Sequence, residues 1–498
     1  MTKDQALELL IQKFEVNRYL GMAATLIHWD ALTSGVPEKS LPARGAAAGW
    51  ISGESFRRFI APETLEAVET LEALSGELNV FEKAMIRETG RAYRKYKAIP
   101  PEEFQAFNAL IAQTQTIWET ARAKNDFAMM LPYYEKLFDY QRRLCDWYGY
   151  EKHPYDALLD DYEKGATVEK LDAFFALLRA RIVPLVKSIS QSGAEPREIN
   201  GVFDIQKQRD LLPWLTDFVG YDRSRGKVGE VEHPFCTTIS RNDVRITTKY
   251  HEDNLMSALF STIHESGHAI YEQNMDEDLA RYGLDDAASM GMHESQSRLY
   301  ENIFCRSRAF TAKLLPKLRE TYDYFGTWDE DSLYRAVNTA RPSLIRIEAD
   351  ELTYSLHIMV RYELEKALMT GEIKTADLPG LWSDKYEEFL GIRPGNDAEG
   401  VLQDVHWSGG SVGYFPSYAI GTAYGAQIVA AMRKSVDLDA AISEGSLAPA
   451  NAWLKENIHR HGAVLLPDDL LKQSTGEPFN PEYYVDYLNE KFTAVYGL

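Results

Sequence analysis

The chain has 498 residues, of which 45% are hydrophobic and 26% are charged, and its formal net charge is −21 at pH 7. This composition is ordinary for a globular protein. The negative charge argues against a nucleic-acid partner, because binding to a phosphate backbone relies on Lys and Arg side chains. No apolar run approaches the roughly 20 residues that a membrane span needs, so we expect no association with a membrane.

The cysteines and the N-terminus predict the compartment. Cys145, Cys236 and Cys305 lie far apart without a paired spacing, which is typical of a reducing compartment and predicts no disulfide framework. The first residues have no basic stretch followed by an apolar core, so no signal peptide is expected. We therefore expect a cytoplasmic protein.

The first part of the chain is predicted to be helical. Residues 4–26 should form an amphipathic helix, because apolar residues recur at the spacing of one helical face: Leu7, Leu10, Ile11 and Phe14. A loop follows to Pro42, a second helix should start near Ala43, and helices should continue to about residue 192. Pro132 is expected to interrupt this pattern. No repeat or long linker marks a boundary, so one domain is expected over residues 1–498.

The character of the sequence changes between residues 193 and 250. Residues 205–219 are predicted to be helical, with Pro213 as a break. Residues 234–240 and 244–250 are rich in β-branched side chains and should form a hairpin. Its edge would allow an extended peptide to pair with it, although a purely structural sheet is an equal alternative.

The next segment contains His-Glu-x-x-His. An apolar helix is predicted to begin after Asp253 or Asn254, either of which can cap it. On that helix His264 and His268 lie one turn apart on the same face, so both imidazoles can reach one metal ion. Glu265 lies beside them, where a carboxylate can act as general base toward water. The alternative is a helix with two surface histidines that bind no metal, but histidines on an apolar helix are buried and need partners.

The second half of the chain is also predicted to be mainly helical. Five helices are expected, over residues 290–315, 331–341, 345–369, 379–390 and 450–458. The whole chain is therefore predicted to be mainly α, with one small β element.

A third metal ligand is needed, because a catalytic zinc is usually held by three protein side chains. The residues that follow the motif offer five candidates, and spacing does not choose between them: Asp285, Asp286, His293, Glu294 and Glu301. The extended His-Glu-x-x-His-x-x-Gly-x-x-His pattern is absent, because its last position is Asn274.

An ordered set of motifs resembles the carboxypeptidase Taq family of metallocarboxypeptidases. The motifs are His233–Phe235, Asp243–Thr247, His264–His268, His293–Arg298, Ile345–Asp350 and Gly400–Trp407, with Trp29-Asp30 and Gly413–Pro416 in further agreement. The resemblance covers nearly the whole chain. It implies a large helical peptidase fold with a deep central cleft, similar to angiotensin-converting-enzyme and neurolysin-like peptidases. Residues 1 to about 200 would wall or cover the cleft, and about 201–498 would form the catalytic half.

The resemblance also implies an activity and a site. Glu294 would be the third metal ligand, and Glu265 the general base. The enzyme would remove single C-terminal residues from peptide substrates with broad specificity, and it would be a homodimer. Zinc is the expected metal, with cobalt as an alternative.

A carboxypeptidase must bind a free carboxylate, for which the planar fork of Arg is suited. Arg346 is the first candidate and Arg245 the second. The alternative for each is a structural ion pair, with Asp350 and Asp243 respectively.

The oxyanion of the tetrahedral intermediate also needs a positioned donor. Three side chains are candidates, on either side of a Gly-rich run: His406, Tyr414 and Tyr418. His233 would bind substrate or support the hairpin. Asp350 and Asp404 would orient the metal-binding histidines or form structural salt bridges.

Two other functions remain open. An oligoendopeptidase or a dipeptidyl carboxypeptidase would use the same metal site. A helical scaffold protein holding a structural metal is a weaker alternative, because structural zinc sites are closed and more often rich in Cys.

Overall fold

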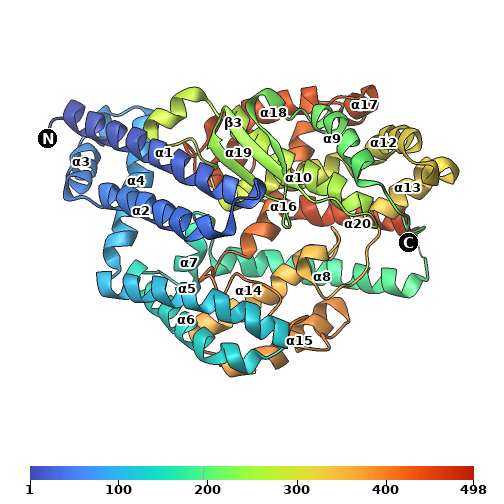
Figure 1. Cartoon of the computed structure of the whole chain (residues 1–498), viewed down its shortest axis with the longest axis horizontal. Coiled ribbons are helices and arrows are strands. Elements are labelled where there is room, and N and C mark those ends of the chain that lie inside the picture. Colours follow the sequence, from blue (N-terminus) through green and yellow to red (C-terminus); the bar gives the residue numbers. More distant parts are fainter. Residues whose placement is uncertain (195) are drawn as a thin grey trace.

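Helices surround one small sheet in the computed structural model, which describes residues 1–194 and 196–498 (Figure 1). The N-terminal helices are α1 (Lys3–Thr33), α2 (Leu41–Phe59), α3 (Pro62–Ala73), α4 (Val80–Ala98), α5 (Pro101–Lys124), α6 (Phe127–Tyr148), α7 (Pro154–Tyr162) and α8 (Val168–Ser192). This confirms the prediction of an almost continuous helical region. None of the described helices combines the length and apolar character that a membrane crossing requires.

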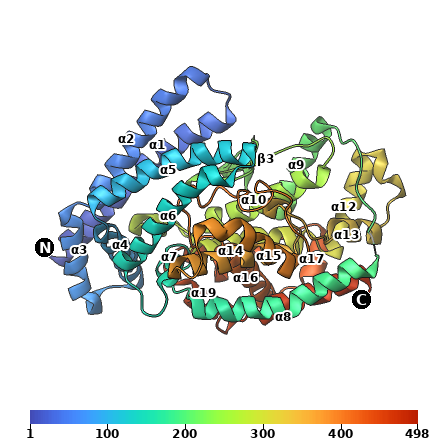
Figure 2. The same cartoon turned by 90° about the horizontal axis from the view of Figure 1, so that it is seen from below.

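The first helix is longer than predicted. A capping box formed by Thr2 and Gln5 starts α1, which continues to Thr33 and lies beside α2 at one end of the molecule (Figures 1 and 2). The predicted proline breaks were wrong. Pro132 and Pro213 lie inside α6 and α9 (Ile205–Val219), where packing of the apolar face outweighs the lost backbone hydrogen bond.

The sheet has three strands, in the order β1-β3-β2. β2 (Cys236–Ser240) and β3 (Asp243–Thr248) are antiparallel, which confirms the hairpin. Sequence analysis missed β1 (Val228–Glu230), which pairs with β3 in parallel and has only three residues. β2 is an edge strand, and it packs against both α1 and α10 (Leu255–Asn274).

Two predicted long helices are divided. The region 290–315 consists of α11 (Met290–Arg298), a π-helical segment (Leu299–Phe304) and α12 (Arg308–Thr321), which begins at its cap Ser307. The region 345–369 is likewise not one helix. A short 3-10 turn covers Arg346–Glu348, and α14 (Tyr354–Thr370) starts later because the Asp350 carboxylate accepts from the backbone of Leu352 and Thr353.

The remaining helices complete the second half of the chain: α13 (Glu330–Val337), α15 (Leu378–Leu390), α16 (Pro416–Met432), α17 (Leu438–Glu444), α18 (Ala448–Asn457), α19 (Pro467–Thr475) and α20 (Glu482–Tyr496). Sequence analysis predicted α13, α15 and α18 but missed the others. The largest omission is α16, which is buried nearly all round and therefore has no amphipathic pattern. It lies near the centre of the molecule (Figure 1) and packs against α11.

Candidate metal and active site

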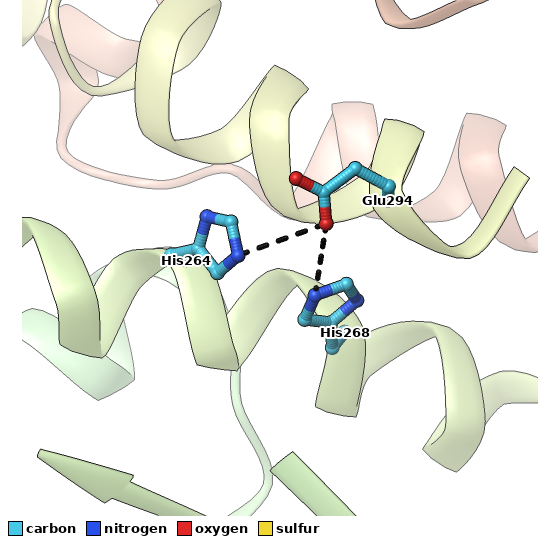
Figure 3. Close-up of side chains that lie close together, drawn as sticks. All are labelled: His264, His268 and Glu294. Atoms are coloured by element: carbon cyan, nitrogen blue, oxygen red, sulfur yellow. Dashed lines mark ion pairs between the residues drawn. The ribbon is translucent and has the colours of Figure 1, made fainter. Parts of the chain in front are cut away.

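Three side chains from two helices converge on one point. His264 and His268 come from α10 and Glu294 comes from α11 (Figure 3). Glu294 Oε2 lies 3.9 Å from His264 Nε2 and 3.5 Å from His268 Nε2. Their ligand atoms all lie within 4.8 Å of one another, a spacing that one metal ion can bridge.

Two glycines allow the helices to approach this closely. A Cβ at Gly267, between the two histidines on α10, would lie 2.6 Å from the carbonyl oxygen of Gln296 on α11. A Cβ at Gly421 on α16 would lie 2.7 Å from the carbonyl oxygen of Gly291 and 2.8 Å from Cβ of Glu294. Contacts under 3.0 Å are not tolerated by a real side chain. The absence of a side chain at these two glycines therefore allows α11, which carries Glu294, to lie close to α10 and α16.

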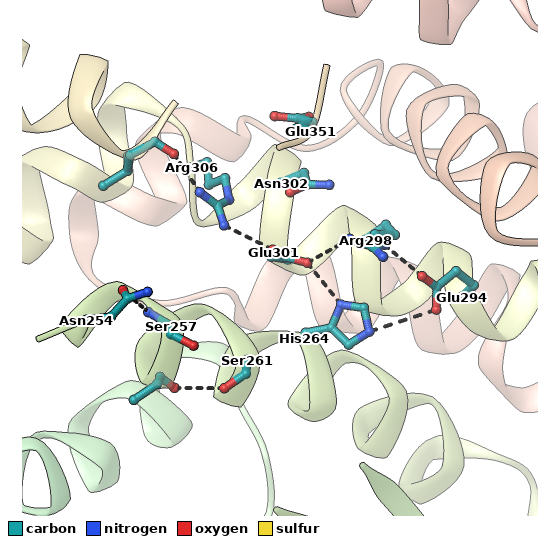
Figure 4. A network of polar contacts seen from close by, with 12 residues as sticks. Asn254, Ser257, Ser261, His264, Glu294, Arg298, Glu301, Asn302, Arg306 and Glu351 are labelled. Carbon is teal, nitrogen blue, oxygen red and sulfur yellow. Dashed lines mark hydrogen bonds and ion pairs between the residues drawn. The ribbon is translucent and has the colours of Figure 1, made fainter. Parts of the chain in front are cut away.

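A network of charged groups orients the side chains of His264 and Glu294 (Figure 4). His264 Nδ1 lies 2.9 Å from Glu301 Oε2, and Arg298 Nε donates to Glu294 Oε1 at 2.7 Å. Glu301 also accepts from Arg306 at 3.0 Å. Burial alone would raise the pKa of Glu294, but Arg298 and the two imidazoles outweigh it and hold that pKa well below its usual range.

His268 is suited to a metal in its uncharged form. Burial, followed by the charge of His293, lowers the pKa of His268 to about 3. Its ring stacks on that of His293 with centroids 4.2 Å apart. Its Nδ1 is buried and has no hydrogen-bond partner among the described residues.

The other candidates for the third ligand do not join the triad in the described part of the chain. His293 stacks on the His268 ring, and its Nε2 lies 3.0 Å from Glu272 Oε1. Glu301 contacts His264 through Nδ1, the nitrogen that faces away from Glu294. Of the five candidates, Glu294 is the one that lies within 4.8 Å of ligand atoms of both His264 and His268 in the described part of the chain.

Glu265 is buried beside the triad, with 7% of its surface exposed. Burial raises its pKa to about 7, against the lowering effect of His264. The electrostatic influence of Glu265 reaches Cys236 on β2, whose pKa is raised mainly by burial and then by Glu265. β2, the edge strand that carries Cys236, also packs against α10, the helix that carries Glu265.

Arg346 is buried and paired, but with Asp404 and not with Asp350, the partner named in its structural alternative. Its Nε and NH2 groups lie 2.9 and 2.8 Å from Asp404 Oδ1, and its NH1 group donates to the Tyr354 hydroxyl at 3.0 Å. The other oxygen of Asp404 accepts from Arg361 at 2.6 and 2.7 Å. Asp350 instead accepts from Leu352 and Thr353 in the turn before α14, and among the described contacts neither aspartate bonds to His264 or His268. The suggestion that they orient the histidines was wrong.

The three candidate oxyanion donors lie together. His406 Nε2 is 3.3 Å from the Tyr418 hydroxyl, and the rings of Tyr414 and Tyr418 have centroids 5.1 Å apart. Burial lowers the pKa of His406 to about 4. The positive charge of Arg346 lies 5.1 Å from the centre of the Tyr418 ring. His406, Tyr414, Tyr418 and Arg346 thus form one group.

Sequence analysis missed Glu365, which anchors the loop that carries His406 and Tyr414. This fully buried carboxylate accepts from Trp407 Nε1 at 2.6 Å, from the Gly413 backbone at 2.9 Å and from the Tyr155 hydroxyl. Nothing in the sequence distinguishes Glu365 from other acidic residues of α14. Its role depends on three donors that are distant in the chain.

Arg245 and His233 stand apart from that group. Arg245 makes a two-pronged contact with Asp243, with both distances 2.7 Å, as its structural alternative predicted. The guanidinium also lies 5.3 Å from the centre of the Trp29 ring. His233 is exposed in the bend between β1 and β2.

Comparison with known proteins decides the family. A family model described as carboxypeptidase Taq (M32) metallopeptidase matches residues 10–492. The chain belongs to this family.

Named carboxypeptidases are similar to it over their whole length. Carboxypeptidase 1 of Bacillus subtilis is 42% identical over 480 residues, which cover 96% of each chain. Thermostable carboxypeptidase 1 of Thermus thermophilus is 34% identical over 511 residues, which cover 100% of each chain. The chain is therefore a metal-dependent carboxypeptidase.

Solved structures of the family have the same fold. The carboxypeptidase of Pyrococcus furiosus superposes with a TM-score of 0.95 at 35% identity, covering 98% of this chain and 99% of that one. Metallocarboxypeptidase 1 of Trypanosoma cruzi has a TM-score of 0.93 at 36% identity, with the same coverage. The predicted family and the mainly helical peptidase fold are confirmed.

The family motifs gain a physical meaning in this metallocarboxypeptidase. Ile345–Asp350 supplies Arg346 and Gly400–Trp407 supplies Asp404 and His406, so two motifs distant in the chain meet in one ion pair. Asp243–Thr247 forms most of β3 and contributes the structural pair of Arg245.

Proposed function

We propose that this metallocarboxypeptidase uses zinc, held by His264, His268 and Glu294, and removes one residue at a time from the C-terminus of peptides. The observation that carries the metal assignment is the convergence of two imidazoles and one carboxylate within 4.8 Å. Three such ligands leave a fourth position open, as catalytic zinc sites require. Cobalt suits the same donors and is an alternative.

A bound divalent ion supplies Lewis-acid activation of water and of the scissile carbonyl. Glu265 takes a proton from the attacking water and returns it to the leaving amine, a role that its buried position next to His264 supports. His406 and Tyr418 contact each other, the Tyr418 ring lies beside Arg346, and Tyr414 packs on Tyr418; we assign these three neutral donors to the developing oxyanion and the carbonyl.

Arg346 is the group that we assign to the terminal carboxylate. Arg346 is 5% exposed, and the orientation of its guanidinium is held by Asp404. A buried, pre-oriented Arg binds a carboxylate with little loss of side-chain entropy. The edge of β2 offers backbone groups for the preceding residues of the peptide, because no strand pairs with that edge in the described part of the chain.

The assembly and compartment are also proposed. We expect a homodimer in the cytoplasm that acts on peptides and binds neither nucleic acid nor membrane. The free cysteines support a reducing compartment, and two of them, Cys145 and Cys305, are buried. Light scattering coupled to gel filtration tests the dimer.

An N-blocked dipeptide and its C-terminally amidated form test the exopeptidase assignment. The zinc-loaded enzyme should cleave the free acid and leave the amide nearly intact. Equal cleavage of the two would contradict the role of Arg346 and favour an endopeptidase.

A further inference from the structure

Tyr354 links the metal-orienting network to the proposed carboxylate anchor. It is the first residue of α14 and is 6% exposed. The guanidinium carbon of Arg298 lies 4.2 Å from the centre of its ring, and its hydroxyl accepts from Arg346 NH1 at 3.0 Å. The phenol therefore contacts two arginines that serve different parts of the site.

The Tyr354 hydroxyl retains a proton to donate. A phenol oxygen that accepts a hydrogen bond still carries its own O–H group. Among the described residues this hydroxyl donates no hydrogen bond, and the oxygens of Asp404, the carboxylate that shares Arg346, are already bonded to Arg346 and Arg361. A nearly buried donor without an acceptor is costly unless a ligand supplies one.

The neighbours of this hydroxyl belong to the substrate-binding group. The ring of Tyr354 meets that of Tyr418 edge-on, with centroids 6.1 Å apart, and Tyr418 in turn contacts His406. The O–H group of Tyr354 that donates no hydrogen bond therefore belongs to the same group of residues as Arg346.

Arg346 alone has too few remaining hydrogen-bond donors to satisfy a carboxylate. A guanidinium has five N–H donors, and the contacts of Nε and NH2 with Asp404 and of NH1 with Tyr354 use three of them, which leaves two. A carboxylate has about four acceptor sites. A further donor that is held against Arg346 would complete the contact.

We propose that Tyr354 is a substrate-binding residue whose hydroxyl donates to the terminal carboxylate bound by Arg346. This inference rests on the proposed function, in which Arg346 is the anchor. The ring of Tyr354 keeps Arg298 in place, and the hydroxyl serves the substrate.

Tyr354→Phe tests the proposal, because it removes the hydroxyl and keeps the ring beneath Arg298. With an N-blocked dipeptide and the zinc-loaded enzyme, KM should rise about 10- to 100-fold, the effect of one hydrogen bond to a charged group. Inhibition by the free amino acid product should weaken by a similar factor. The zinc content should be unchanged, and kcat should stay close to that of the wild type.

A matched control and a second variant make the outcome unambiguous. Tyr484→Phe removes another buried hydroxyl, which contacts Ser355 Oγ at 2.9 Å, and should leave KM unchanged. Arg346→Gln should raise KM strongly.

If Arg346→Gln raises KM and Tyr354→Phe does not, the inference is overturned, while the assignment of Arg346 as the carboxylate anchor stands. If neither variant changes KM, the proposed anchor fails as well. A fall in kcat at constant KM in Tyr354→Phe would place the hydroxyl at the reacting carbonyl and overturn the inference.

Discussion

His264 Nδ1 lies 2.9 Å from Glu301 Oε2, so the carboxylate of a π-helical segment holds the imidazole of a proposed metal ligand on another helix. This contact places the proton of His264 on Nδ1 and leaves Nε2 free toward Glu294. π-Helical turns are frequent at functional sites. Here the wider turn brings Glu301 within reach of His264.

Glu301→Gln should weaken zinc binding about 10- to 100-fold without removing a direct ligand. The amide still reaches His264 but carries no charge to raise the basicity of the imidazole. Competition with a zinc-binding dye measures the affinity. Glu88→Gln, which removes a carboxylate paired with Lys164 at 2.6 Å, is the control and should bind zinc normally. Equal affinities for the wild type and both variants would show that Glu301 does not support the metal.

Glu265→Gln should lower kcat by about 10²- to 10⁴-fold, the usual effect of losing a general base. Because Glu265 is not one of the three ligands, the variant should retain its full zinc content. Steady-state kinetics and metal analysis on the same sample give both quantities. A variant with normal kcat would remove Glu265 from the mechanism.

Gly421→Ala should destabilise the protein by about 1–3 kcal/mol, because the new Cβ would overlap Gly291 and Glu294. The displacement of α11 should also weaken zinc binding. Gly380→Ala is the matched control. This glycine is in α15, and no described atom outside its own helical turn lies within 4 Å of the place that a methyl group would take, so the change should be neutral or stabilising by at most about 1 kcal/mol. Urea unfolding compares the two, and similar midpoints would contradict the close approach of α11 and α16.

Glu163 should make stability depend on pH. Burial raises its pKa from 4.5 to about 7. Hydrogen bonds from Ser289, Tyr424 and the Gly291 backbone lower the pKa, but burial outweighs them. The negative charge of Asp468 raises the pKa slightly further. The native state therefore binds a proton more tightly than the unfolded state. The contribution is fully present below pH 4.5 and is lost as the pH rises through 7, which amounts to at most about 3 kcal/mol.

Comparison with Glu163→Gln isolates this effect, because the amide does not titrate. The unfolding free energy of the wild type, relative to the variant, should fall as the pH is raised from below 4.5 to above 7. A difference between the two proteins that stays constant over this range would contradict the raised pKa of Glu163.

Local patterns in the sequence predicted much of the fold and the centre of the site. The spacing of His264 and His268 requires a helix, and β-branched runs on either side of Arg241-Asn242-Asp243 predict the hairpin. The features that were not predicted are those that depend on long-range packing. α16 has no polar face to reveal a helical period, and the break after Arg298 follows from a π-helical segment that no local pattern encodes.

The same limit applies to the partners of the site residues. The structural alternative for Arg346 was an ion pair with Asp350, which is close in sequence, but Arg346 pairs with Asp404, which is 58 residues away. Glu365 was not predicted at all, because its three donors come from α7 and from the loop before α16. The division of the chain near residue 200 into a wall and a catalytic half stays a prediction.

Mass-spectrometric analysis of a short peptide during digestion tests the central claim most directly. The zinc-loaded enzyme should produce a ladder of products that differ by one residue and lose mass only from the free C-terminus, and the C-terminally amidated form of the same peptide should remain intact. Steps of two residues, or internal cleavage of both peptides at similar rates, would contradict a single-residue carboxypeptidase anchored by Arg346.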